Sequence, residues 1–227
     1  LDIEARVRFH VFAFRQGLLK EHEAVYQRGD QHDGYLGLPA HAKIRHKLGN
    51  QRPDHDTPRK PNVEAVEFIV EQISPILAKA RPDIVINIFG SNMPESVKAL
   101  ENDNVKMIGF AEHLDDVYHN HRVFIAPLLS GAGIKGKVLE SMAYGLPTVL
   151  SEIAAEGTGL THNISTLIAD KPEEWVEAII KLYDDSALWE RFAQNELALV
   201  ESQYSFDYGV KAFKEIFASV GLFSTKG

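Results

Sequence analysis

The sequence has no cysteine among its 227 residues. Disulfide bonds, zinc sites built on thiolates and thiol nucleophiles are therefore excluded, and the chain is consistent with a reducing compartment. It also lacks an apolar run of the roughly 18 residues that a membrane-spanning helix needs, and its first residues do not show the charged and then apolar pattern of a signal peptide. We expect a soluble, cytoplasmic chain, with peripheral attachment at the inner membrane face left open.

Positive charge is also scarce, because 24 Lys and Arg stand against 32 Asp and Glu and give a net charge of −8. Such a chain is not expected to bind nucleic acid in general. Its 44% hydrophobic content, 16 Gly and 10 Pro are ordinary for a soluble globular protein. A chain of this length forms one large or two small domains and buries roughly 70% of its unfolded surface.

The most informative stretch is residues 130–147, which read Ser-Gly-Ala-Gly-Ile-Lys-Gly-Lys-Val-Leu-Glu-Ser-Met-Ala-Tyr-Gly-Leu-Pro. Three glycines in six residues predict a flexible loop, and a helix should follow from near Lys135 to Gly145, where Gly and then Pro end it. Its buried stripe is predicted from the spacing of Val138, Leu139, Met142 and Ala143. Glu140 is expected on the opposite face, with Lys137, Ser141 and Tyr144.

The start of this helix is a candidate anion site. Its free N–H groups point back into the glycine loop, where an anion would lie close to the backbone. Lys135 and Lys137 stand at the same end, where cations oppose the helix dipole unless an anion is bound. Glu140, one turn further on, could accept hydrogen bonds from sugar hydroxyls, so the surface suits a diphosphate and a ribose. The alternative is a pair of exposed lysines beside a tight turn, with Glu140 as a surface carboxylate paired with Lys137.

Strands alternate with helices along most of the chain, which predicts an α/β fold with a parallel sheet and helices on both faces. Strands are expected at residues 7–14, 84–89, 105–108, 123–125, 148–150 and 166–168. Helices are expected at residues 18–28, 42–48, 62–80 with a kink at Pro75, 94–100, 114–120, 173–184, 187–203 and 206–220. Because ligands of such sheets bind outside the carboxyl ends of the strands, the loops near Gly90, 109–110, 127–133 and 151–157 should line one crevice.

Several segments carry a resemblance to a known family: residues 61–66, 87–90, 108–110, 126–128, 131–147 and 155–157. In this order and spacing they resemble the C-terminal, donor-binding domain of group 1 retaining glycosyltransferases, which have the two-domain GT-B fold. The resemblance extends from residue 62 to about residue 220. It implies a Rossmann-like sheet, hexosyl transfer from a nucleoside diphosphate sugar with retention of anomeric configuration, and no metal or other cofactor.

The resemblance also implies roles for individual residues. Lys135 and Glu140 would be catalytic, because Lys135 and Lys137 would neutralise the leaving diphosphate while Glu140 binds the ribose. Gly109 and Phe110 would hold the base, with Phe110 as plain core the alternative, and the loop that holds Glu156 would approach the donor. The complete predicted donor-binding set is Gly109, Phe110, Gly131, Gly133, Ile134, Lys135, Lys137, Glu140, Glu156 and Gly157.

The sequence departs from the family pattern at two places. Relatives place a first glutamate near the transferred sugar, and the matching position here is Ala132. The family's opening strand is also not found shortly before Pro61, where residues 51–56 are Gln-Arg-Pro-Asp-His-Asp. Residues 7–14 are either that strand or a remnant of the other domain, and Arg59 and Lys60 either hold the diphosphate or form a solvated pair.

Three segments follow: an N-terminal segment (1–60) of uncertain role, with one βα unit and then irregular chain, a nucleotide-sugar-binding domain (61–205), and a C-terminal helical segment (206–227) that crosses back. In the family the acceptor, here an unknown glycan, lipid or protein, binds mainly to an N-terminal domain, which we expect to be missing. Alternatives are an inactive GT-B-like scaffold and a nucleotide-sugar epimerase of related fold. The acidic pairs 115–116 and 184–185 are expected to cap helices rather than to bind metal.

Overall fold

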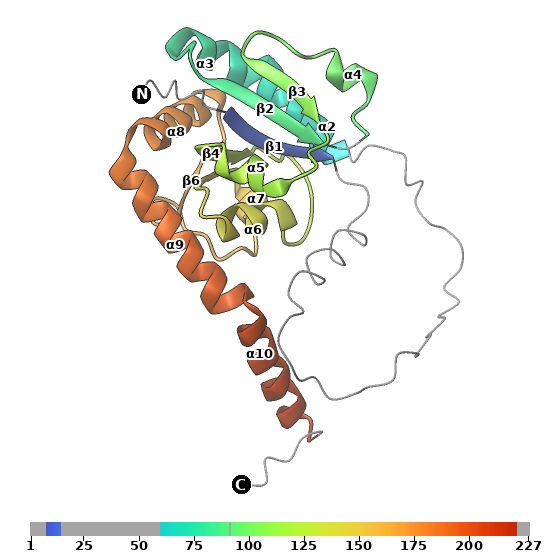
Figure 1. Ribbon diagram of the computed structural model, residues 1–227, viewed down its shortest axis with the longest axis vertical. Coiled ribbons are helices and arrows are strands. Elements are labelled where there is room, and N and C mark those ends of the chain that lie inside the picture. The colour runs from blue at the N-terminus through green and yellow to red at the C-terminus, as the bar shows by residue number, and fades with distance from the viewer. Residues whose placement is uncertain (1–7, 15–59, 91, 222–227) are drawn as a thin grey trace, which may run out of the picture. The chain divides into compact units, whose positions relative to one another are not determined.

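The computed structural model describes residues 8–14, 60–90 and 92–221. These residues form a six-stranded sheet in the order β3-β2-β1-β4-β5-β6, and neighbouring strands are parallel (Figure 1). The strands are β1 (Arg8–Phe14), β2 (Val85–Gly90), β3 (Val105–Gly109), β4 (Val123–Ala126), β5 (Thr148–Leu150) and β6 (Thr166–Ile168). This strand order is that of a Rossmann fold, so the predicted fold class is confirmed.

Strand β1 lies in the middle of the sheet. Its backbone pairs with β2, where Phe9 is opposite Ile86, and with β4, where Phe9 is opposite Val123. Residues 8–14, for which the sequence left two alternatives, are therefore a strand of this sheet. The helices predicted at residues 18–28 and 42–48 lie outside the described residues, as does Arg59.

Helices cover both faces of the sheet (Figure 1). One hydrophobic cluster takes side chains from α2 (Lys60–Phe68), the turn η1 (Ile69–Ile73), α3 (Ser74–Ala80), α4 (Glu95–Lys98), α8 (Pro172–Asp184) and α9 (Ser186–Tyr204). The other takes them from α5 (Leu114–His119), α6 (Gly136–Ala143) and α7 (Glu152–Ala155). The two clusters lie on opposite faces of the sheet, as alternate side chains of β4 show. Val123 and Ile125 belong to the first cluster, and Phe124 and Ala126 belong to the second.

The proline in the first long helix changes its geometry locally. The sequence predicts a kink at Pro75, and the structure has a π-helical turn, Ile69–Ile73, that ends two residues before it. The N–H of Ser74 bonds to the carbonyl of Ile69, five residues earlier. Proline has no N–H to donate and its ring crowds the carbonyl four residues back. The wider turn accommodates that ring, and α3 continues the helix.

Two further helices complete the described chain. Helix α9 packs against α6 and α8, and α10 (Phe206–Ser219) follows it (Figure 1). Among the described residues, no side chain of α10 is buried. No helix in the same part of the chain combines the length and the apolar content needed to span a bilayer.

Candidate functional site

The carboxyl ends of β1 and β4 form the point where the strand order of the sheet reverses, which is where ligands of this fold class bind. Helix α2 packs on the β1 side of this point. On the β4 side lies the loop that follows β4, residues 127–135, which we call the glycine loop. The Ser130 hydroxyl in this loop donates a hydrogen bond of 3.2 Å to Glu64 Oε2 on α2. The two sides of the reversal point are therefore bridged by side chains.

The glycine loop leads directly into the N-terminus of α6. Gly131 and Gly133 have φ angles of +132° and +74°, which side chains rarely adopt. The N-cap residue is Lys135, and its side chain makes no capping hydrogen bond, since an ammonium group cannot accept one. Its Nζ instead donates to the carbonyl of Gly133 at 2.5 Å. A helix N-terminus without a side-chain cap, beside a cation, suits an anion.

Glu140 is held in a fixed position on α6. Lys137 Nζ lies 2.5 Å from Glu140 Oε2, and the Tyr118 hydroxyl donates to the same oxygen at 3.0 Å. The pairing of Glu140 with Lys137, which the sequence left as an alternative, is therefore present. Both bonds end on Oε2, so Oε1 is the oxygen that remains available within the described residues to accept a ligand hydroxyl.

Two tyrosines support the position of Glu140: Tyr118 on α5 and Tyr144 directly after α6. The ring of Tyr144 stacks on that of Tyr118, with centroids 4.6 Å apart. The Tyr144 hydroxyl donates to Asp115 Oδ1 at 2.5 Å. Burial, reinforced by this hydrogen bond, raises the pKa of Tyr144 to about 12. Tyr144 therefore stays protonated near neutral pH and serves as a donor rather than a base.

The acidic pairs that were expected to cap helices behave differently from each other. Asp185 is the N-cap of α9, where it accepts a 2.9 Å bond from the N–H of Leu188. At α5, however, the N-cap is His113, so the expectation for residues 115–116 is wrong. Asp115 instead lies in the first turn and binds Tyr144, because a tertiary donor reaches it there.

The loop after β5 approaches the glycine loop. Residues 151–157 were predicted to be a loop, but they contain the short helix α7. Its cap is Ser151, which accepts a bond from the N–H of Ala154 at 3.2 Å. The Ser151 hydroxyl also donates to the carbonyl of Leu128 at 2.8 Å. This one side chain therefore ties the α7 segment to the glycine loop.

Gly157 makes a second close approach between these loops. Its φ is +74°, and a Cβ at this position would lie 3.2 Å from Ile134 Cγ1. Its carbonyl accepts a 2.9 Å bond from the Tyr204 hydroxyl at the end of α9. Glu156, next to it, is exposed. The structure thus brings the predicted Gly131, Gly133, Ile134, Lys135, Glu156 and Gly157 into one region.

Gly109 and Phe110 lie apart from this region. Gly109 is the last residue of β3 and Phe110 follows it. Strand β3 is the third strand from β4, so at about 4.8 Å per strand the two strand ends are roughly 14 Å apart. Phe110 is 63% exposed, which rules out the alternative that it is plain core. A ligand that contacts both Phe110 and the glycine loop must span that distance. Helix α5, whose Tyr118 binds Glu140, would lie beside its path.

The buried face of α6 differs from the one predicted. Val138 and Met142 are buried as expected, but Ala143 is exposed and Leu139 only partly buried. Ser141, predicted on the exposed face, is fully buried, and its hydroxyl donates to the carbonyl of Leu146 at 2.8 Å. A small hydroxyl can be buried when it satisfies a carbonyl at the end of its own helix.

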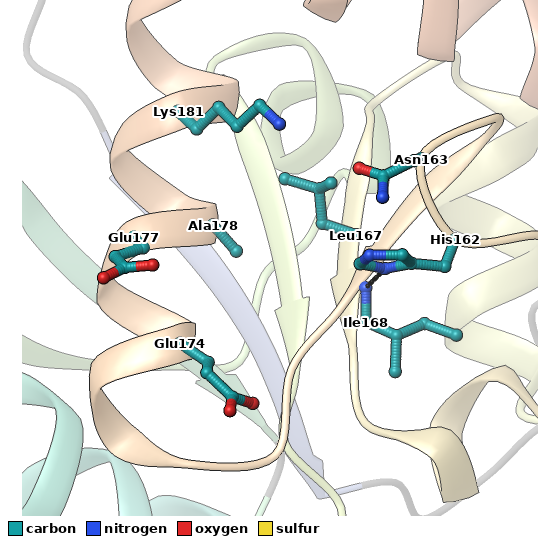
Figure 2. Close-up of a pocket in the computed structure, with 8 residues that line it drawn as sticks. All are labelled: His162, Asn163, Leu167, Ile168, Glu174, Glu177, Ala178 and Lys181. Atoms are coloured by element: carbon teal, nitrogen blue, oxygen red, sulfur yellow. Dashed lines mark hydrogen bonds between the residues drawn. The ribbon is translucent and has the colours of Figure 1, made fainter.

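A hollow of about 380 Å³ lies away from the glycine loop, between α8 and the outer edge of β6 (Figure 2). Its lining residues are His162, Asn163, Leu167, Ile168, Glu174, Glu177, Ala178 and Lys181. None of the predicted site residues lines it. His162 Nδ1 accepts a 2.8 Å bond from the N–H of Ile168, which covers that edge group of β6.

Comparison with known proteins gives the family. A family model described as glycosyl transferases group 1 matches residues 58–185, more than half of the chain. The chain belongs to the group 1 glycosyltransferases. The matched range begins just before α2 and ends with α8, so it includes the glycine loop, α6 and α7.

The individual relatives of this group 1 chain are distant. An uncharacterized 44.6 kDa protein in the cps region of Klebsiella pneumoniae is 25% identical over 165 residues, which are 69% of this chain and 42% of that protein. The solved C-terminal domain of the group 1 family protein LpcC from Francisella tularensis has a TM-score of 0.52 and 20% identity, with 65% and 82% of the two chains covered. This chain therefore spans less than half of the Klebsiella protein.

A further solved structure is HepE from Anabaena in complex with UDP. Its TM-score is 0.57 at 15% identity, over 65% of this chain and 44% of HepE. At these identities the solved structures establish the fold alone. That fold is the one seen in the C-terminal half of GT-B glycosyltransferases, as the resemblance implies.

Sequence reasoning missed four residues that bond to the glycine loop, to α6 or to the α7 segment: Glu64, Tyr118, Ser151 and Tyr204. Each bonds to a residue far away in the sequence, at separations of 66, 22, 23 and 47 residues. Only Ser151 had a local signal, since Ser is a preferred helix cap.

Proposed function

We propose that this chain is the donor-binding part of a retaining glycosyltransferase that transfers a hexosyl group from a nucleoside diphosphate sugar to an acceptor. One observation carries the proposal: in a group 1 family chain, an α6 N-terminus without a side-chain cap opens into the glycine loop with Lys135 at its start. The HepE complex, which has the same fold, contains UDP. That ligand supports a nucleoside diphosphate as the donor's carrier.

The proposed chemistry needs charge stabilisation at the leaving group. When the glycosidic bond of the donor breaks, negative charge develops on the diphosphate, and N–H groups and cations already in place lower the barrier. Lys135 would give up its bond to the Gly133 carbonyl for a bond to a phosphate oxygen. Lys137 would add its charge while remaining near Glu140. In this proposal no metal ion takes part.

The rest of the donor would lie along the crevice. Glu140 would accept a hydrogen bond from a ribose hydroxyl through Oε1, while Lys137 and Tyr118 hold Oε2. The base would reach toward Gly109 and Phe110. Ile134, Glu156 and Gly157 would border the diphosphate and the sugar, together with the glycines of the loop.

Transfer also needs an acceptor site, which we propose lies on a second domain. Helix α10 supports this, because exposed apolar side chains recur along it at Phe206, Phe213 and Ile216, and exposed Val220 follows its last residue. Its charged residues Asp207, Lys211, Lys214 and Glu215 balance, so the helix lacks the cationic face typical of membrane-surface helices. The acceptor and the cytoplasmic location remain predictions.

Calorimetric titration of the whole chain tests the donor site. The chain is titrated with UDP, GDP and ADP, and then with uridine, guanosine and adenosine. One diphosphate should bind at least about tenfold more tightly than its parent nucleoside, because the charge-assisted phosphate contacts are lost with the phosphates. Absence of binding by all three diphosphates to folded protein would contradict the proposal and favour a scaffold role.

A further inference from the structure

Glu64 is a carboxylate that contacts the glycine loop from a different element of the fold. It lies on α2, on the β1 side of the point where the strand order reverses, and its Oε2 accepts a 3.2 Å bond from Ser130 on the β4 side. It is partly buried and is carried by a helix that packs on the sheet. A carboxylate from outside the glycine loop is therefore held against Ser130, directly before Gly131.

The proposed donor orientation places the sugar near this carboxylate. The nucleoside and the sugar are bonded to opposite ends of the diphosphate. In the proposed orientation the ribose lies at Glu140 and the diphosphate at the glycine loop, so the sugar at the far end of the diphosphate would lie beyond the α6 N-terminus, where Ser130 reaches α2. The loop itself has no acidic side chain, and Ser130 is its one uncharged polar residue. Sugar hydroxyls arriving there would find backbone carbonyls and the Ser130 hydroxyl, but no carboxylate within the loop.

We propose that Glu64 is the residue that recognises the transferred sugar, by accepting hydrogen bonds from its hydroxyl groups. This inference rests on the proposed function. Ala132, within the loop, cannot accept a side-chain hydrogen bond, and Glu64 supplies a carboxylate to the same loop from α2. Ser130 orients the carboxylate and shares the sugar contact. The ligand class is the hexosyl part of a nucleoside diphosphate sugar, and not its nucleotide.

A competing role for Glu64 is purely mechanical, as a brace for the loop through Ser130. The two roles differ in what they do to the nucleotide. A brace holds the whole loop, so its loss would weaken binding of the nucleoside diphosphate with or without a sugar. A sugar contact matters only when the sugar is present.

The experiment measures affinities of the full chain for the nucleoside diphosphate that it binds and for the corresponding nucleoside diphosphate hexoses. The variants are Glu64→Ala, Glu64→Gln and Ser130→Ala. The control is Glu67→Ala, because Glu67 is exposed on the same helix three residues further on. Thermal denaturation of each variant verifies that it is folded.

Glu64→Ala should weaken binding of the preferred sugar nucleotide by about 10- to 100-fold, as expected for loss of hydrogen bonds to a charged acceptor. Affinity for the free diphosphate should change less than about twofold, and Glu67→Ala should change neither. Glu64→Gln, which keeps an acceptor, should restore part of the affinity. Equal losses for both ligands, reproduced by Ser130→Ala, would overturn the inference in favour of a brace. An unchanged sugar nucleotide affinity would contradict both roles and would also overturn the inference. Failure of the wild type to bind any diphosphate would instead contradict the proposed function, and this inference with it.

Discussion

Replacing Glu196 by glutamine should change how the stability of this chain depends on pH. Glu196 lies on α9 with no exposed surface, and its Oε1 accepts bonds from the N–H of Thr148 at 3.0 Å and from its hydroxyl at 2.7 Å. Burial raises the pKa of Glu196 well above its ordinary value of 4.5, and the bonds from Thr148 oppose this rise only in part. The carboxyl group is therefore protonated in the folded chain at pH values where the unfolded chain has lost the proton.

The sign and size of the effect follow from proton linkage. Above pH 4.5 the folded state binds one more proton than the unfolded state, so the free energy of unfolding falls as the pH rises. One proton contributes a slope of about −1.4 kcal/mol per pH unit, which continues until the pH reaches the folded-state pKa. Glutamine keeps the carbonyl that Thr148 needs and has no proton to lose, so this slope should disappear. Its amide adds an unpaired donor near Oε2, but that cost does not depend on pH.

Urea denaturation of the wild type and of Glu196→Gln at several pH values between 5 and 8 measures this slope. From pH 5 up to the folded-state pKa of Glu196, the free energy of unfolding of the variant relative to the wild type should rise by about 1.4 kcal/mol per pH unit. In Glu201→Gln, which changes an exposed residue of the same helix, the free energy of unfolding should depend on pH as it does in the wild type. If the free energy of unfolding of Glu196→Gln shows the same pH dependence as that of the wild type, the assignment of a protonated, buried Glu196 is refuted.

Three further changes test the crevice. Replacing Lys135 and Lys137 together by alanine should weaken nucleoside diphosphate binding about 10- to 100-fold and nucleoside binding by less than threefold, and calorimetry that finds unchanged diphosphate affinity would remove the phosphate site. Glu140→Ala should weaken a nucleoside diphosphate about tenfold and leave inorganic pyrophosphate unaffected, whereas equal effects on both ligands would argue against a ribose contact. Gly157→Ala should lower the melting temperature by several degrees, because a positive φ costs roughly 1–2 kcal/mol and the new methyl crowds a side chain at 3.2 Å. The matched control, Gly109→Ala, has the same kind of φ but nothing within 4 Å, so it should cost less, and equal losses would contradict the close approach of the two loops.

The sequence was sufficient for the architecture because its signals are local. Alternating apolar strands and periodic helices predicted the parallel sheet, and the order of Gly and Pro marked the glycine loop and the end of α6 at Gly145, which adopts φ +64°. The place of β1 could not be decided, because residues 15–59 separate it from α2 and pairing in a sheet is not local. The short helix α7 was missed because four residues carry too little periodicity to detect.

The site was predicted less completely, for a related reason. The pair Lys137 and Glu140 is three residues apart on one helix, so sequence spacing alone suggests it. The bonds from Tyr118 to Glu140 and from Ser130 to Glu64 join residues 22 and 66 positions apart, and only the packed fold brings them together. The exposed face of α6 was misplaced for the same reason, because contacts from other elements decided which side of the helix is buried.

Backbone amide NMR on the isotope-labelled chain tests the central claim most directly, because it reports where a nucleoside diphosphate binds. Titration with the best-binding diphosphate should produce the largest shifts at residues 131–138, with smaller ones at 156–157 and 109–110. Shifts concentrated instead at the hollow beside β6, among residues 162–168 and 174–181, would contradict the proposed donor site, and so would the absence of any shift at saturating ligand.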